Sequence, residues 1–416
     1  MKKLFDTYIK NNLGLINLFG KSFGRILFLL LTSFFAYKLS VEDFAAFAIF
    51  WSSLRLFTFF SVNNLYIIYF NEVRENLIDY KKWPIKISSN IIFNAIIFSV
   101  ISVILSAIIF DNIVIIILMT PSILLFIIIR NISEFSKADN SLNLYIFIED
   151  FLFYFLFFVF GVLAIFTANN LTTIIMALFL TLLITAIASL ILFKRKFNFQ
   201  IKKINIRYNH FSFTNFKLGV NYTFLRGNDF FSNFGVRYLG QIYFGDFFVA
   251  YTHIMYQFYN IFSLITIAVI SGLQSKITVK NISNFHKTFV KSTYLKILKT
   301  IAPFIGVGII IIVFFNSQIL EWFFPKYVQY DELLVKVSFI GFIFMFIQPL
   351  VLILLYNNKF FNIKALNFTQ YIVMFILYML PFVFPKFNEQ YWLLTVMTAF
   401  IIIQGFFAVL NYKKIR

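Results

Sequence analysis

Three arginines lie within segments that are otherwise typical of membrane-spanning helices: Arg25, Arg55 and Arg226. Neither Arg25 nor Arg55 has an acidic residue near it in the sequence. An arginine guanidinium binds phosphate or carboxylate through two parallel hydrogen bonds, which strengthen where water is scarce. Because a charged side chain inside a membrane is expensive and marks function by default, these residues predict a binding site for an anion.

The depths of the arginines along their helices favour a shared site. At a rise of about 1.5 Å per residue, Arg25 lies roughly 18 Å and Arg226 roughly 15 Å from the inner membrane edge. By the same count, Arg55 lies roughly 16 Å from the outer edge. The hydrocarbon core is only about 30 Å thick, so we expect the three side chains to converge near its midplane.

Further polar residues recur at helical spacing along the same segments, Thr32 and Ser52 among them. Such stripes cannot face lipid, so we expect them to line a watery cavity in which amide groups hydrogen-bond a sugar. The predicted substrate-binding residues are Arg25, Arg55, Arg226, Lys21, His253, Gln257 and Asn233, and Asp229 is assigned to coupling or charge pairing.

Three of these residues have a second interpretation. The ammonium of Lys21 is close enough to the inner membrane edge to extend to the surface. Asp229 lies three residues from Arg226 and would neutralise it as a buried pair. A single histidine such as His253 is more often a packed, hydrogen-bonded side chain than a proton carrier.

The composition indicates the class of protein that must hold these residues. Of the 416 residues, 61% are hydrophobic and only 13% are charged, whereas a soluble chain averages about 25% charged residues. No soluble core could absorb so many apolar runs of bilayer length. The absence of cysteine excludes disulfides, thiolate metal sites and cysteine catalysis.

Twelve apolar stretches of about 20 residues predict an all-α integral membrane protein. The basic segment 194–215 falls at the midpoint of the chain. We therefore expect an N-terminal six-helix bundle (1–193), a basic cytoplasmic linker (194–215) and a C-terminal six-helix bundle (216–416) around a central cavity. The predicted spans are 13–37, 44–70, 86–110, 113–130, 144–168, 171–193, 216–238, 246–271, 299–316, 333–356, 361–384 and 390–411.

The charges of the connections predict the orientation. About 26 of the 36 Lys and Arg residues lie in alternate connections and at the two termini. The opposite side carries four: Lys38, Arg237, Lys326 and Lys386. The positive-inside rule therefore places both termini in the cytoplasm. It also accounts for the net charge of +19 without nucleic acid, because no compact soluble domain gathers the basic residues into one patch.

Two connections have features of their own. Residues 280–300 combine aromatic residues near one face with lysines on much of the rest, which predicts an interfacial helix on anionic lipid. The longest outer connection, 316–332, has only about 17 residues. The basic residues of 280–300, like those of the inner connection 193–210, are also explained by topology signalling and inner-leaflet anchoring alone.

Residues 18–50, "LFGKSFGRILFLLLTSFFAYKLSVEDFAAFAIF", resemble the beginning of Wzx-type polysaccharide (O-antigen) flippases of the MOP superfamily of MATE-like transporters. In those proteins a first helix with Ser and Arg precedes an L-(S/G)-x-E-(D/E)-F-G motif that leads into the second helix. Ala45 replaces the usual Gly here. A similar "GDFFVAY" (245–251) opens the eighth predicted span, consistent with two related halves.

The resemblance implies translocation of an undecaprenyl-diphosphate-linked oligosaccharide from the cytoplasmic to the periplasmic leaflet of a bacterial inner membrane, by alternating access. It also implies coupling to a proton or sodium gradient, without a cofactor. The polymerase and chain-length proteins of lipopolysaccharide biosynthesis are the partners that it implies. Lipid II flippases of the same superfamily place arginines in helices 1, 2 and 8 at the diphosphate. Arg25 and Arg55 match the first two, but helix 8 offers only His253.

Two other functions fit the same pattern less well. A MATE-like exporter of small molecules would bind cations through acidic residues deep in the helices, where the sequence interpretation finds only Asp229. A membrane polymerase or ligase of lipid-linked glycans would carry a large outer loop with catalytic residues. Since no nucleophile–base arrangement, metal cluster or phosphate-binding loop is evident, we do not expect an enzyme.

Overall fold

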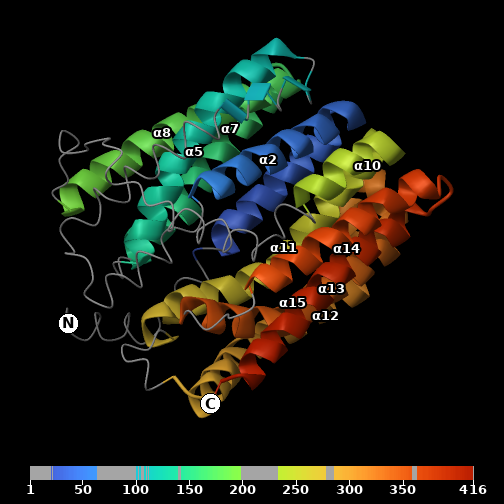
Figure 1. Ribbon diagram of the computed structural model, residues 1–416. Helices are drawn as coiled ribbons and strands as arrows, with labels where there is room; N and C mark the ends of the chain where they lie inside the picture. Colours follow the sequence, from blue (N-terminus) through green and yellow to red (C-terminus); the bar gives the residue numbers. More distant parts are fainter. Residues whose placement is uncertain are drawn as a thin grey trace. The chain divides into compact units, whose positions relative to one another are not determined.

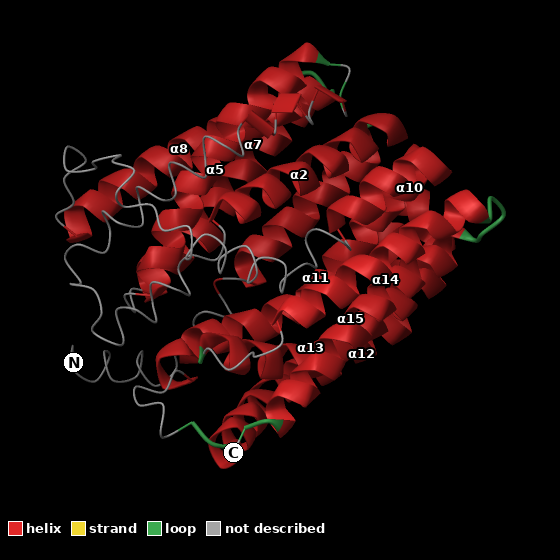
Figure 2. Cartoon of the chain, viewed as in Figure 1, coloured by secondary structure: helices red, strands yellow, loops and turns green. Residues whose placement is uncertain are grey.

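The computed structural model is helical throughout the residues that it describes (Figure 1, Figure 2). These are residues 20, 22–62, 100–138 apart from 102, 105, 106, 109 and 111, 142–197, 233–277, 285–357 and 363–415. The first described helix covers 22–38. The others are α2 (Val41–Val62), α5 (Ile113–Ala138), α6 (Leu142–Tyr145), the π-helix η1 (Ile146–Leu152), α7 (Phe153–Thr167), α8 (Leu171–Phe197), α10 (Val236–Phe244), α11 (Asp246–Ile277), α12 (Lys287–Phe323), the 3-10 helix η6 (Pro325–Tyr330), α13 (Asp331–Tyr356), α14 (Ile363–Val383) and α15 (Glu389–Lys413).

Eight helical segments in this part of the chain are long and apolar enough to cross a membrane, and they match eight of the twelve predicted spans. The other four predicted spans, 13–37, 44–70, 86–110 and 216–238, each extend outside the described residues. The all-helical, multi-pass membrane class is therefore confirmed, while the count of twelve stays a prediction.

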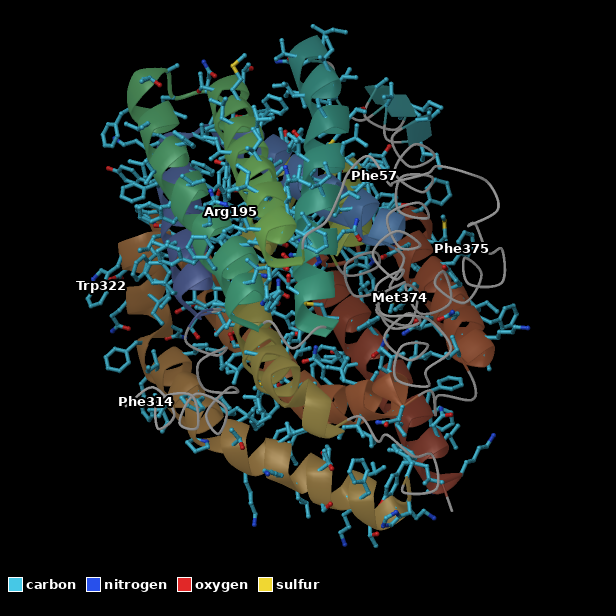
Figure 3. The ribbon with its side chains drawn as sticks, turned by 90° about the vertical axis from the view of Figure 1, so that its left-hand side faces the viewer. Phe57, Arg195, Phe314, Trp322, Met374 and Phe375 are labelled. Atoms are coloured by element: carbon cyan, nitrogen blue, oxygen red, sulfur yellow. The ribbon has the colours of Figure 1, made fainter. Side chains whose placement is uncertain are left out.

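Large apolar side chains cover the outside of these helices. Trp322 and Phe314 on α12 are 76% and 71% exposed and point away from the protein, as does Phe375 on α14 (Figure 3). Exposed aromatic surface on this scale is unfavourable in water and favourable against lipid chains. These side chains therefore mark the lipid-facing surface.

Local sequence explains where several helices begin. The Ser40 hydroxyl accepts a hydrogen bond from the Asp43 amide, which satisfies a free N–H at the start of α2. The Asn388 side chain accepts from two amides at the start of α15 in the same way. Between α10 and α11 the chain turns at Gly245, whose φ of 84° suits a residue without Cβ. Both related motifs of the sequence, "EDF" and "GDF", thus open a helix.

The chain forms two compact units: unit 1 comprises residues 1–45 and 230–416, and unit 2 comprises residues 46–229. This grouping differs from the predicted halves, because the first helix packs with the C-terminal helices. The division falls within α2, between Ala45 and Ala46.

The core of unit 2 is built around Trp51 of α2. Its indole stacks on Phe153 and Phe157 with ring centroids 6.2 and 6.1 Å apart, and Phe126 of α5 lies 6.3 Å away. Trp51 is only 2% exposed. Stacked aromatic rings add to the stability gained from burying their area, so α2, α5 and α7 are held as one layer.

Unit 1 is organised around α11, the most enclosed of the eight candidate spans. It lies close to α13 at Gly341, where an added Cβ would come within 3.0 Å of the Tyr259 carbonyl oxygen. It also lies close to α10 at Gly240, whose neighbour is the buried ring of Phe248. These close approaches make α11 the central helix of the unit.

At the predicted outer end of unit 1, the N-terminal segment packs against the α12–α13 connection. The Lys326 ammonium donates to the Leu39 carbonyl over 2.9 Å, and the Ser33 hydroxyl donates to the Phe323 carbonyl. The ring of Phe44 lies 6.4 Å from that of Tyr327. We call these residues the outer contact cluster: Ser33, Leu39, Phe44, Phe323, Lys326 and Tyr327.

Two predictions about connections need correction. The outer connection predicted at 316–332 is shorter, because α12 continues to Phe323 and η6 leads into α13 at Asp331. The predicted interfacial helix at 280–300 is, from Lys287 on, the first part of α12 rather than a separate helix. In both places the chain remains helical where loops were expected.

Candidate substrate site

The predicted site residues within the described part of the chain fall into two groups by exposure. Arg25, Arg55 and Gln257 are partly exposed. Asn233 and His253 are buried, at 3% and 0% exposure. The remaining predicted site residues, Lys21, Arg226 and Asp229, lie outside the described residues.

Arg25 lies in the first turn of helix 22–38, in unit 1. One side of this helix packs inward through Phe28 and Phe35, which are 2% and 0% exposed. The guanidinium of Arg25 is therefore carried by a helix that is fixed by its own buried aromatic residues.

Arg55 belongs to unit 2 and follows Trp51 by one turn of α2. Leu54 and Leu56 on either side of it are 0% and 4% exposed, whereas Arg55 itself keeps part of its surface open. The stacked aromatic core around Trp51 thus fixes the helix that carries this cation.

His253 and Gln257 meet on α11, as their spacing of four residues predicts. The two Nε2 atoms lie 3.3 Å apart, within hydrogen-bond distance. The edge of the His253 imidazole also contacts the ring of Phe44, with centroids 5.5 Å apart. His253 is therefore a packed residue that joins the exposed amide of Gln257 to the outer contact cluster.

A second set of polar residues includes Asn233, which lies in the short π-helical segment 233–235 before α10. Arg237 follows it by one turn and is 2% exposed, although the charge pattern placed it among the outer-side cations. Its guanidinium carbon lies 5.5 Å from the centre of the Tyr256 ring of α11, a cation–π distance. The structure thus adds a buried arginine to unit 1.

The polar stripes are less exposed to water than the sequence suggested. Thr32 and Ser52 are 0% and 1% exposed, and their hydroxyls donate to carbonyls of their own helices. A hydroxyl that bonds to the preceding turn needs no water. These two hydroxyls therefore give no sign of facing a watery cavity, and the cavity stays a prediction.

Acidic residues at membrane depth were missed by the sequence interpretation. The π-helix η1 carries Glu149, which pairs with Arg130 of α5, and Asp150, which is 5% exposed. Both acids lie inside the candidate span Ile146–Thr167. Single-turn π-helices are frequent at functional sites. Glu149 and Asp150 are thus two further candidates for cation binding or coupling, in addition to Asp229.

The described residues contain no group of three His, Cys, Asp or Glu side chains that could hold a metal ion. Among the described residues, the buried polar side chains carry hydroxyl, amide, guanidinium and imidazole groups, together with the carboxylate of Asp150. Guanidinium and amide groups of this kind bind oxyanions and sugar hydroxyls.

No protein-family model and no curated protein matches the sequence. Among solved structures, the chain is similar to an inward-facing multidrug resistance MATE family transporter of the MOP superfamily, with a TM-score of 0.64 at 13% identity over 94% of this chain and 93% of that one. The outward-facing conformation of such a transporter gives a TM-score of 0.66 at 12% identity over 97% and 94%.

A third similar structure is a MOP superfamily transporter from Pyrococcus furiosus that is described as having a binding pocket of reverse polarity, suggesting a different function. Its TM-score is 0.66 at 11% identity, over 97% of this chain and 94% of that one. Likeness at this level of identity establishes the fold. The chain is a multi-pass membrane protein with the fold of MATE-like transporters of the MOP superfamily.

Proposed function

We propose that the protein is a flippase that moves an undecaprenyl-diphosphate-linked oligosaccharide from the cytoplasmic to the periplasmic leaflet by alternating access. The observation that carries this proposal is the pair Arg25 and Arg55, two partly exposed cations within apolar helices of a transporter fold. A diphosphate offers each guanidinium a bidentate partner at a depth where charged side chains are expensive and mark function. The resemblance of residues 18–50 to Wzx-type flippases supports the same cargo.

The amide groups of this site suit the glycan part of the cargo. Gln257 presents both a donor and an acceptor on the partly exposed side of α11, and the buried His253 lies within hydrogen-bond distance of it. An amide that is held in one orientation can discriminate between sugar hydroxyls. In this proposal Arg25 and Arg55 bind the diphosphate, Gln257 contacts a sugar, and His253 is a positioning residue.

The fold by itself does not decide the charge of the cargo. Two of the similar structures are multidrug resistance transporters, whereas the transporter from Pyrococcus furiosus is described as having a binding pocket of reverse polarity. The choice therefore depends on this chain's own residues. Its partly exposed arginines favour an anionic cargo.

The proposal includes a location and a setting. The protein resides in the bacterial inner membrane with both termini in the cytoplasm, uses a proton or sodium gradient, and passes its product to polymerase and chain-length proteins of surface-polysaccharide biosynthesis. It is not an enzyme in this proposal. The α12–α13 connection, where the sequence allowed most room for an outer catalytic loop, is the short 3-10 helix η6.

Removal of the protein from cells tests the proposal directly. Lipid-linked oligosaccharide is expected to accumulate on the cytoplasmic leaflet, where glycan-modifying enzymes added to inverted membrane vesicles reach it. Accumulation of single repeat units on the periplasmic leaflet would instead identify a polymerase. Unchanged lipid-linked intermediates would exclude both functions.

The second candidate, a MATE-like exporter of small molecules, is favoured by one observation: the buried Asp150 and the neighbouring Glu149 in a candidate span. The two functions differ in which residues matter. Export of cationic compounds would require Asp150, so that Asp150→Asn increases drug sensitivity, whereas glycan display would require Arg25 and Arg55.

A further inference from the structure

The first part of α12 carries a basic surface that the substrate site does not use. Lys287, Lys291, Lys296 and Lys299 are all exposed, and three of them recur at intervals that are multiples of four residues. From Phe247 to Leu320 the sequence contains no Asp or Glu. Within the described part of the chain none of these lysines forms an ion pair, so their charges face outward uncompensated.

The opposite face of this segment is fixed to the protein. Val290, Ile297 and Ile301 are 0% exposed. The Tyr294 hydroxyl donates to the Phe346 carbonyl of α13 over 2.9 Å. Because the apolar face is already buried on other helices, it is not free to enter a bilayer as an interfacial helix would.

The length of α12 places these lysines beside the membrane surface. α12 is kinked at Phe315, but the part before the kink, from Lys287 to Phe314, already spans about 42 Å, whereas the hydrocarbon core is about 30 Å thick. The apolar part with Phe314 and Trp322 faces lipid near the other end of the same helix (Figure 3). The basic start of α12 therefore extends past the hydrocarbon region and into the headgroup layer.

The two ends of unit 1 agree with this placement. The start of α12 lies at the same end of the unit as Lys413 and Lys414 at the close of α15, the end that the charge pattern predicts to be cytoplasmic (Figure 1). Cytoplasmic leaflets carry anionic lipid phosphates that attract basic segments at this distance.

We propose that Lys287, Lys291, Lys296 and Lys299 form a binding surface for the phosphate headgroups of anionic membrane lipids. The helix fixes the backbone positions of the four lysines on one side of the protein, and their flexible side chains let the ammonium groups reach several phosphates. The interaction is electrostatic, and it depends on lysine charge rather than on insertion of apolar residues. This inference is independent of the cargo that the transporter carries.

The test uses the full chain in phosphatidylcholine vesicles that contain a small amount of spin-labelled phosphatidylglycerol. The fraction of motionally restricted label reports lipid bound to the protein, and labelled phosphatidylcholine gives the reference. Lys291→Gln with Lys299→Gln is expected to lower the preference for phosphatidylglycerol about thirtyfold, from the combined attraction of the two lysines to an anionic surface. Lys291→Arg with Lys299→Arg should keep it.

The matched control is Lys413→Gln with Lys414→Gln, which removes the same charge from an exposed site at the same end of the unit. This control should leave the lipid preference unchanged. Neither double substitution should change the thermal unfolding temperature. Raised salt should weaken the preference, because screening reduces attraction between exposed charges.

Three outcomes would overturn the proposal. If Lys291→Gln with Lys299→Gln left the lipid preference unchanged, these lysines would not form a lipid-binding surface. If the control pair lowered the preference equally, the effect would be due to the overall charge of the protein. Displacement of the labelled lipid by millimolar inorganic pyrophosphate would assign the lysines to a soluble phosphate compound instead.

Discussion

Arg25 and Arg55 are partly exposed within apolar helices, as is Arg130, but Arg130 pairs with Glu149. Each of the two can be replaced singly. We predict that Arg25→Ala and Arg55→Ala each abolish display of the surface polysaccharide. Lysine at either position should restore only part of it, because a single ammonium cannot form the bidentate bond. Display is measured with a glycan-specific antibody or lectin, and protein abundance in the membrane should remain normal.

The control for this prediction is Arg195→Ala. Arg195 is exposed near the end of α8 (Figure 3), so its loss should leave display unchanged. Full activity of Arg25→Ala or Arg55→Ala would exclude that residue from the site.

A second residue-scale prediction concerns packing at Gly240. A Cβ at this position would lie 2.1 Å from Cε1 of Phe248, a ring that is 1% exposed and hemmed in by Tyr251 and Trp392. Gly240→Ala should therefore destabilise unit 1 by about 1–3 kcal/mol, as overpacking does. Gly306→Ala is the matched control, since nothing lies within 4 Å of its added Cβ. Thermal unfolding in detergent should separate the two, and equal midpoints would contradict the prediction.

The sequence could indicate some candidate residues and not others for physical reasons. Arg25 and Arg55 were evident as candidates because each is a charge in an apolar run with no acidic residue near it in the sequence. The Arg130–Glu149 pair was not, because its members are 19 residues apart and meet only after η1 packs on α5. The exposure of Thr32 was also misjudged, because sequence spacing does not reveal that its hydroxyl bonds to its own helix.

At the scale of helices, the outer contact cluster joins the N-terminal segment to the α12–α13 connection. These contacts all lie within unit 1. If the proposed alternating access opens the outer end of this unit, we expect them to separate. Because the chain has no cysteine, Ser33→Cys with Phe323→Cys gives a single reactive pair. A short bifunctional thiol reagent across that pair should stop polysaccharide display, and a reductant that removes the bridge should restore it.

The control pair is Ser317→Cys with Asp331→Cys, whose side chains lie 2.7 Å apart across the α12–α13 connection. This bridge leaves the N-terminal segment free, so display should continue. Continued display with residues 33 and 323 bridged would show that the outer contact cluster does not need to open.

For the whole molecule, eight spans could be read from the sequence because bilayer length demands long apolar runs. The compact units could not be predicted from the sequence. They depend on contacts of the first helix with the C-terminal helices, and hydrophobic periodicity does not indicate which helices pack together. The length of α12 was also underestimated, because its lysines were taken to mark a separate helix.

The predicted orientation can be measured on the same cysteine-free chain. Lys386→Cys and Lys413→Cys place one thiol each at exposed residues that the charge pattern assigns to opposite sides of the membrane. A maleimide that cannot cross the inner membrane should label position 386 in intact spheroplasts, and position 413 only after lysis. The reverse labelling pattern would show that the predicted orientation is wrong, and the proposed direction of transport would then be reversed.

The place where the two units divide has a mechanical consequence. The boundary lies inside α2, which runs unbroken from Val41 to Val62 and contains neither glycine nor proline. Helices rarely bend sharply without such residues, so this segment should transmit displacement as a rod. Phe44 and Arg55 are then two points on one lever, about 16 Å apart. Under the proposed function, a displacement that cargo causes at Arg55 would pass along the backbone of α2 to Phe44, whose ring packs on His253.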